Sequence, residues 1–138
     1  MRLIPGVKMG TVSALIVVDT AGALASGSAS DNAYLVDTEH FLGSWGEGSS
    51  SLHTLCEDGQ VVRWSVAPVS PSGDISIIGF SGDMVSGGVC HPVAEGPPGD
   101  QYWFGRVEAQ GQFASFAYTV TLSISGRQMS LNSNLKVA

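Results

Sequence analysis

The chain has 138 residues, a length at which one domain can bury a hydrophobic core without disulfide bridges. Charged residues make up only 13% of the sequence and 18 residues are glycine, a composition that favours strands and turns over helices. The formal net charge of −6 disfavours nucleic acid and anionic membrane surfaces as partners, because both repel an acidic protein. We expect a single domain over residues 1–138, with residues 1–11 as a candidate flexible N-terminal extension.

The first apolar run, Val12 to Val18, has two interpretations. With Arg2 and Lys8 before it and Ala23-Leu24-Ala25 after it, the run imitates a secretory signal with a small-residue cleavage site. Asp19 opposes this interpretation, because a charge before the cleavage site is poorly tolerated. Leu15 to Val18 fits equally well as a buried first strand ending at Asp19. No segment approaches the roughly 20 apolar residues that span a bilayer. We therefore expect a soluble, cytoplasmic protein, with secretion as the alternative.

Short elements and turns follow along the N-terminal half. A helical turn over residues 20–25, capped by Asp19 or Thr20, leads to a second strand at Ala33–Val36. Residues 37–51 are rich in glycine and polar side chains and are predicted to be a long loop. A third strand at residues 51–55 and a tight turn at residues 57–59 complete this half.

The fourth and fifth strands are predicted at residues 60–67 and 74–80. In the fourth, Val62, Trp64 and Val66 share one face and Arg63 lies on the other. The fifth is apolar on both faces, which indicates a central position in its sheet. Glycine and proline dominate residues 81–100, so we expect a long excursion there with one short strand at residues 89–93.

The alternating run from Gln112 to Ser125 is the clearest structural signal. Polar and apolar residues alternate along it, the period-2 pattern of a strand with one buried face. It lies between a strand at residues 102–109 and a last strand from residue 128, joined by a turn at residues 125–127. The apolar side of the run carries Phe116, Tyr118, Val120, Leu122 and Ile124, and the polar side carries Thr119, Thr121 and Ser123. We predict an all-β fold, an antiparallel Greek-key β-sandwich or jelly-roll-like domain of 8–9 strands.

Six short motifs follow one another along the predicted strands: Leu15-Ile16-Val17-Val18-Asp19-Thr20, Ala33-Tyr34-Leu35-Val36, Gly59-Gln60-Val61-Val62-Arg63-Trp64, Ile78-Gly79-Phe80, Tyr102-Trp103-Phe104-Gly105-Arg106-Val107 and Tyr118-Thr119-Val120-Thr121-Leu122. Their order resembles the PixA/AidA family of bacterial inclusion-body proteins. The resemblance implies a compact sandwich that self-associates in the bacterial cytoplasm, with no established catalytic set and with sugar binding as its suspected activity.

The two cysteines, Cys56 and Cys90, could form one disulfide, but a domain of this size does not need one. Free thiols are the favoured interpretation. His91 follows Cys90, yet neighbours in a strand point to opposite faces, so we predict no nucleophile–base pair there.

The predicted loop after the second strand is the first candidate for a ligand site. Asp37, Glu39 and His40, together with Glu47, could gather Ca²⁺, or a carboxylate could accept from sugar hydroxyls while Trp45 stacks on the ring. A solvated loop is the alternative. The spacing fits no known calcium loop, so we expect neither a metal nor another cofactor, with Ca²⁺ as the alternative.

Charged and aromatic residues on the fourth and seventh predicted strands are the second candidate. Trp103 and Arg106 join the expected ligand-binding residues, and no catalytic residue can be named. Arg63, Arg106 and Glu108 could line a cleft or form an exposed salt bridge of little energetic value.

Three functions stay open at the level of the sequence. The chain could bind a neutral polar ligand such as a carbohydrate, which an acidic protein without a basic patch tolerates better than a phosphate. It could be a self-assembling storage protein, and we expect a homodimer through the Thr119-Thr121-Ser123 face or an edge strand. It could also be a cofactor-free cyclase or isomerase in which Glu39 or Glu108 acts as an acid.

Overall fold

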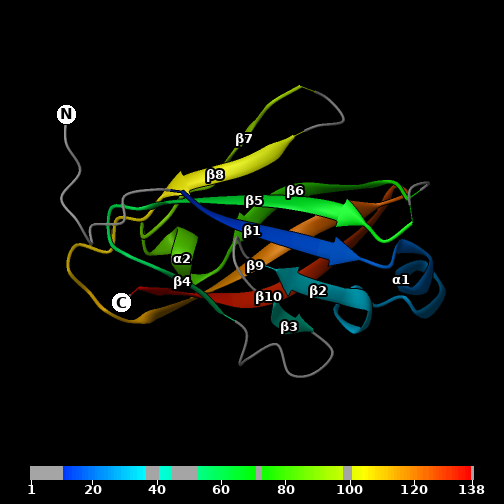
Figure 1. The fold of residues 1–138 in the computed structure, drawn as a ribbon, viewed down its shortest axis with the longest axis horizontal. Helices are drawn as coiled ribbons and strands as arrows, with labels where there is room; N and C mark the ends of the chain where they lie inside the picture. The colour runs from blue at the N-terminus through cyan, green and yellow to red at the C-terminus, as the bar shows by residue number, and fades with distance from the viewer. Residues whose placement is uncertain (1–10, 37–40, 45–52, 71–72, 98–100, 138) are drawn as a thin grey trace.

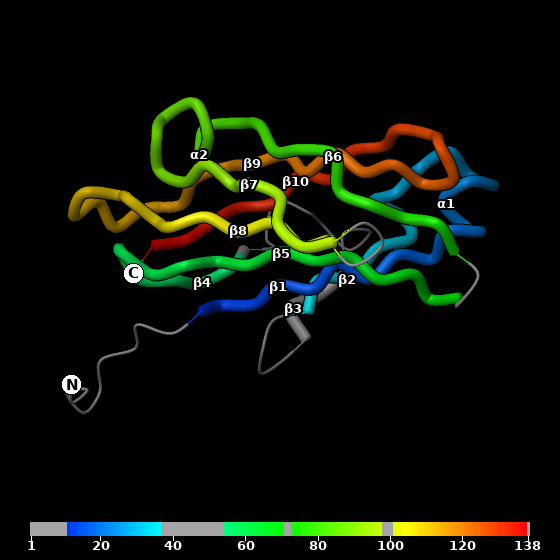
Figure 2. Tube along the Cα trace, turned by 90° about the horizontal axis from the view of Figure 1, so that it is seen from above, coloured from blue at the N-terminus to red at the C-terminus, as the bar shows by residue number. Residues whose placement is uncertain are grey.

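The computed structural model describes residues 11–36, 41–44, 53–70, 73–97 and 101–137. They form two β-sheets packed face to face, which Figure 2 shows as two layers. The larger sheet has the order β3 (Phe41–Ser44), β2 (Ala33–Val36), β1 (Thr11–Val18), β5 (Val61–Pro68), β8 (Tyr102–Arg106) and β7 (Val93–Glu95). The smaller sheet has the order β4 (His53–Cys56), β10 (Arg127–Val137), β9 (Ser115–Ile124) and β6 (Ile75–Ser81).

Helical structure in the described ranges is confined to short segments, α1 (Thr20–Ser26), α2 (Asp83–Ser86) and a 3-10 turn at Ser30–Asn32 (Figure 1). None of these is long and apolar enough to cross a membrane. The prediction of an all-β sandwich is confirmed. The described residues form ten strands, not eight or nine, because Phe41–Ser44, placed in a loop by the sequence, pairs with β2.

Two strand pairings differ from a purely antiparallel sandwich. β1 pairs in parallel with β5, and β4 pairs in parallel with β10, whereas the other pairings are antiparallel. Parallel neighbours need long crossover connections. The chain supplies them by placing β2, β3 and β4 between β1 and β5, and β5 to β9 between β4 and β10.

The β9–β10 hairpin follows directly from the alternating run. Tyr118, Val120 and Leu122 are buried, and the polar residues between them lie on the outer side of the sheet, as expected. Ser125 (φ 49°) and Gly126 (φ 82°) form the two-residue connection. Two consecutive positive φ angles are those of a type I′ turn, whose twist matches a β-hairpin.

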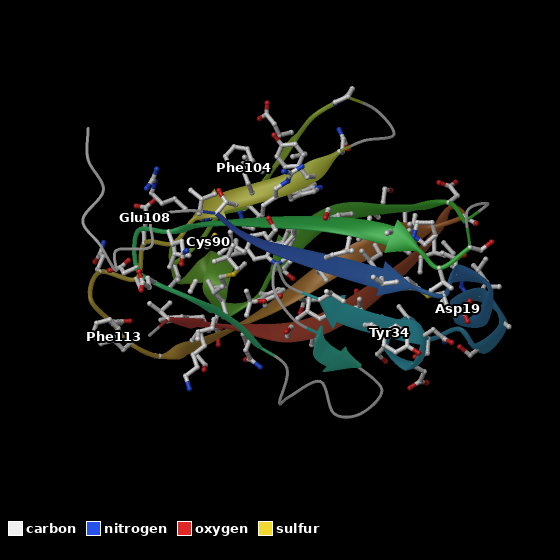
Figure 3. All side chains as sticks on the ribbon, in the orientation of Figure 1. Asp19, Tyr34, Cys90, Phe104, Glu108 and Phe113 are labelled. Carbon is white, nitrogen blue, oxygen red and sulfur yellow. The ribbon has the colours of Figure 1, made fainter. Side chains whose placement is uncertain are left out.

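The first strand and helix also follow the sequence. β1 is half-buried to fully buried from Val12 to Val18, and Asp19 then caps α1 by accepting from the N–H of Gly22 at 3.1 Å (Figure 3). α1 ends at Ser26 and is capped by Gly27 (φ 76°), whose N–H donates to the carbonyl of Ala23 at 2.8 Å.

The segment between β6 and β8 differs from expectation. Val89 and Cys90 were predicted to begin a strand, but their N–H groups both donate to the carbonyl of Met84 in α2, and β7 starts only at Val93. The prediction of a central fifth strand is also wrong, because β6 is an edge strand of the smaller sheet. Its second apolar face is exposed, with Ile78 48% accessible to solvent.

A carboxylate fastens the β4–β5 turn to the segment that precedes β9. Asp58 accepts from the N–H groups of Ala109 at 2.8 Å and Gly111 at 2.9 Å. These hydrogen bonds favour the ionised form and hold the pKa of Asp58 below its ordinary value.

An aromatic cluster joins the two sheets in the core. Trp64 from β5 packs against Phe80 from β6 and Tyr118 from β9, with ring centroids 4.8 and 5.8 Å apart. The indole N–H of Trp64 donates to the Tyr118 hydroxyl at 3.3 Å. Among the predicted core residues, Trp64, Tyr118, Val120 and Leu122 are buried, while Phe80 and Phe116 are half-buried.

Candidate functional site

A pocket of about 340 Å³ lies at the rim of the sandwich, where β5, β6 and the beginning of β8 meet. Its volume falls at the lower end of the roughly 300–1,000 Å³ typical of small-molecule sites. The lining residues are Arg63, Ser65, Val66, Ile75, Ser76, Ile77, Gln101, Tyr102 and Trp103.

The different lengths of β5 and β8 create this pocket. The two strands pair from Val61↔Arg106 to Trp64↔Trp103, and β8 begins only one residue earlier, at Tyr102. β5 continues to Pro68, held on its other side by β1. The edge of β5 beyond Trp64 therefore has no partner from β8, and the first half of β6 lies across the gap from the opposite sheet.

Arg63 and Tyr102 form the outer wall of the pocket. Both lie on the face of the larger sheet that points away from the core, and the guanidinium carbon of Arg63 sits 3.9 Å above the centre of the Tyr102 ring. A guanidinium stacked on an aromatic face gains a cation–π attraction and keeps its N–H groups available at its edge. The ring of Phe104 lies 6.3 Å from that of Tyr102 and extends this aromatic surface along β8.

Trp103 forms the inner wall. It lies opposite Trp64 in the β5–β8 register and shares its inward face, with its ring 5.7 Å from that of Phe80. The Nε1 atom of Trp103 is buried and has no hydrogen-bond partner among the described residues. Because this nitrogen is inaccessible to solvent, Trp103 lines the pocket without presenting its N–H group to it.

The polar lining combines one group that only donates, the guanidinium of Arg63, with an amide and hydroxyls that can each donate or accept. The amide belongs to Gln101 and the hydroxyls to Ser65, Ser76 and Tyr102. Among the described lining residues, Arg63 carries the only charge, which favours an acceptor group of a ligand beside it.

The structure distributes the predicted site residues unevenly. Trp103 lines the pocket, whereas Arg106 donates through Nη1 to the carbonyl of Gly59 at 2.8 Å and is not part of the lining. The remaining predicted ligand-binding residues, Asp37, Glu39, His40 and Trp45, lie outside the described residues, and so does Glu47. The strands that flank residues 37–40, β2 and β3, are separated from β8 by β1 and β5.

Sequence reasoning missed Gln101, Ser65 and the β6 residues of the pocket. Their contribution depends on how β6 faces β5 across the two sheets, and no local pattern reports that. Arg63 could be found from the sequence, because the alternation of the fourth strand placed it on the outer face as a candidate for a cleft.

Both cysteines are free and buried (Figure 3 shows Cys90). Burial raises the pKa of each thiol to about 12, and the nearby negative charges of Asp58, for Cys56, and Glu108, for Cys90, act in the same direction. A reactive cysteine needs a lowered pKa and solvent access, so these thiols are structural. Within the described ranges, no three His, Cys, Asp or Glu side chains gather into a metal-binding group.

Fold and pocket together define a β-sandwich of two mixed sheets with a pocket of about 340 Å³ at its rim. Residues 10–130 match the family described as "Domain of unknown function (DUF8788)", and the chain belongs to this family. A search of curated proteins found no match.

Among solved structures, the fold is similar to the crystal structure of the inclusion body protein PixA from Burkholderia cenocepacia J2315. The TM-score is 0.70 at 13% sequence identity, and the match covers 99% of this chain and 100% of that chain. The expected resemblance to PixA is thereby confirmed at the level of the fold.

Proposed function

We propose that this chain is a binding protein for a small polar ligand, a carbohydrate, and that the pocket between β5, β6 and β8 holds it. The single observation that carries this proposal is the pocket itself, a space of about 340 Å³ with aromatic walls and several polar groups.

The lining supports a sugar for a chemical reason. A pyranose ring has apolar C–H faces that pack on aromatic side chains and an edge of hydroxyls that need hydrogen-bond partners. Trp103 and Tyr102 provide the aromatic surfaces, while Gln101 and Ser65 provide groups that both donate and accept.

Binding of methyl glycosides, measured by isothermal titration calorimetry against the wild type and two tyrosine variants, tests the proposal. Tyr102→Ala removes one aromatic wall and should weaken binding at least about tenfold, a loss of about 1.4 kcal/mol. Tyr34→Ala is the matched control, because Tyr34 is an exposed tyrosine of β2 in the same sheet and does not line the pocket.

A pocket-filling variant adds a second, independent test. Ser65→Phe introduces a large side chain into the lining and should abolish binding, whereas Ser130→Phe, at an exposed position on β10, should not. If Trp45→Ala abolishes binding while Tyr102→Ala does not, the ligand sits at the loop predicted from the sequence and the pocket is not its site.

Self-association is the second candidate function. PixA, the solved structure of similar fold, is described as an inclusion body protein, and β6 is an edge strand with Ile78 exposed on it. Edge strands with exposed apolar side chains pair readily with other chains. The alternative interface is the Thr119-Thr121-Ser123 face, but the Thr119 hydroxyl already donates to Asn132 within the same sheet at 2.7 Å. We therefore favour the edge strand as the homodimer interface.

Light scattering tests the homodimer against the chain mass of 14.3 kDa. The wild type should report twice this mass, and Ile78→Lys should return it to the monomer, because a charge on an edge strand blocks pairing. Val93→Lys makes the same change on β7, the edge of the other sheet, and should leave the dimer intact. A monomeric wild type at high micromolar concentration would remove this candidate.

We also propose a cytoplasmic location. Two cysteines that are free and buried suit a reducing compartment, where thiols persist without pairing.

A further inference from the structure

We propose that the ligand of the rim pocket carries a carboxylate, held by the guanidinium of Arg63, so that the favoured ligand is an acidic sugar of the uronic acid type. The inference rests on the proposed function, because it names the chemistry of the ligand in the same pocket.

The state of Arg63 is the first reason. The chain has only six Lys and Arg residues against twelve Asp and Glu, so most basic side chains have acidic groups available in excess. Arg63 nevertheless stacks on Tyr102, and no described residue forms an ion pair with it. Stacking fixes the guanidinium plane, and within the described part of the chain no acidic group occupies its N–H fork, a geometry suited to a planar carboxylate.

The composition of the lining is the second reason. The described lining contains a guanidinium, an amide and hydroxyls, but no carboxylate. The amide and the hydroxyls can donate or accept and so suit the hydroxyls of any sugar, whereas the guanidinium only donates. A carboxylate supplies two acceptor oxygens and a negative charge to this guanidinium, which a sugar hydroxyl does not.

At the level of the sequence, the net charge of −6 predicts a neutral ligand. A stacked arginine, however, acts on a ligand at contact distance, where its own positive charge matters more than the net charge of the chain.

The experiment compares matched pairs of ligands. Methyl glycosides of glucuronic, galacturonic and mannuronic acid are titrated beside the corresponding neutral methyl glucoside, galactoside and mannoside, which differ only in a hydroxymethyl group at the position of the carboxylate. In at least one pair, we expect the acidic member to bind about tenfold more tightly or better, with an affinity that falls as salt rises.

Variants of Arg63 assign the effect to one side chain. Arg63→Gln should remove the preference for the acidic member, so that the two members of a pair bind this variant with affinities within about twofold of each other. Arg63→Lys keeps the charge without the fork and should retain part of the preference. Lys136→Gln, at an exposed position on β10 outside the pocket, makes the same change in net charge and should retain all of it.

The outcomes separate this inference from the proposed function. Neutral glycosides that bind as tightly as their acidic partners, or a preference that survives Arg63→Gln, overturn the carboxylate and leave sugar binding in place. If Lys136→Gln removes the preference as fully as Arg63→Gln does, the carboxylate inference is also overturned, because the preference then depends on net charge. If no member of any pair binds, the proposed function fails, and this inference fails with it.

Discussion

Replacing Tyr118 with phenylalanine removes one buried hydroxyl from the centre of the sandwich. The indole N–H of Trp64 donates to this hydroxyl at 3.3 Å, and Trp64 and Tyr118 are 0% and 1% exposed. The phenylalanine ring keeps the packing against Trp64 and Phe80, so no cavity larger than the lost oxygen results. The indole N–H, however, loses its acceptor, and a buried donor left unsatisfied costs about 1–3 kcal/mol.

Urea unfolding followed by circular dichroism measures the loss. With a slope of about 2 kcal/mol per molar urea, a loss of about 2 kcal/mol lowers the unfolding midpoint by about 1 M. Tyr102→Phe is the control, because the contacts of Tyr102 with Arg63 and Phe104 involve its ring. Its midpoint should stay within about 0.25 M of the wild type, the range of a neutral surface change. A Tyr118→Phe protein that unfolds at the wild-type midpoint would refute this reasoning.

Four further changes have defined outcomes. Val120→Asp should unfold the domain by circular dichroism, because Val120 is fully buried and an isolated buried carboxylate costs several kcal/mol; a folded variant would show that the wrong face was assigned. Asp58→Asn should lower the stability at pH 7, because the backbone hydrogen bonds that lower the pKa of Asp58 stabilise its ionised form in the folded state. The difference in stability from the wild type should shrink as the pH falls below 3.8, the ordinary pKa, and a difference that stays constant between pH 2 and 7 would contradict this. Cys56 and Cys90, with pKa values of about 12, should resist a thiol reagent at pH 8 until urea unfolds the chain, and rapid labelling of the native protein would count against their burial. Gly105→Ala should destabilise the fold, because its Cβ would lie 2.6 Å from the Cys90 sulfur, and adding Cys90→Ala should recover part of the loss; without that recovery, the steric cause is wrong.

The sequence predicted those elements whose residue pattern depends only on near neighbours in the chain. The alternation around Val120 placed β9 and its buried face, because a strand that covers a core on one side must repeat with period two. The Asp19 cap placed α1 for a similar reason, since its hydrogen bond spans only three residues.

Errors occurred where neighbours in space are distant in sequence. Ile75, Ile77 and Ile78 make β6 apolar on both faces, which predicts a central strand, yet among the described strands β6 pairs with β9 alone. The parallel pairing of β1 with β5 leaves no mark in either strand, because both would have the same composition beside antiparallel partners.

The candidate site could likewise be predicted from the sequence only in part. The outward position of Arg63 follows from its own strand, but its role in a pocket requires that β8 begin at Tyr102 and that β6 lie across the gap. Strand lengths and sheet packing decide both conditions, and the sequence of the fourth strand contains neither.

The position of β10 has a consequence for how the protein is made in the cell. β10 lies inside the smaller sheet, between β4 and β9, although it follows all other described strands in the chain. While a ribosome is still translating residues 127–137, β4 lacks its neighbour in the sheet, and β9 is paired along one edge only, with β6. The smaller sheet can therefore close only after translation of β10, and until then the nascent chain exposes unpaired strand edges of the kind that promote aggregation.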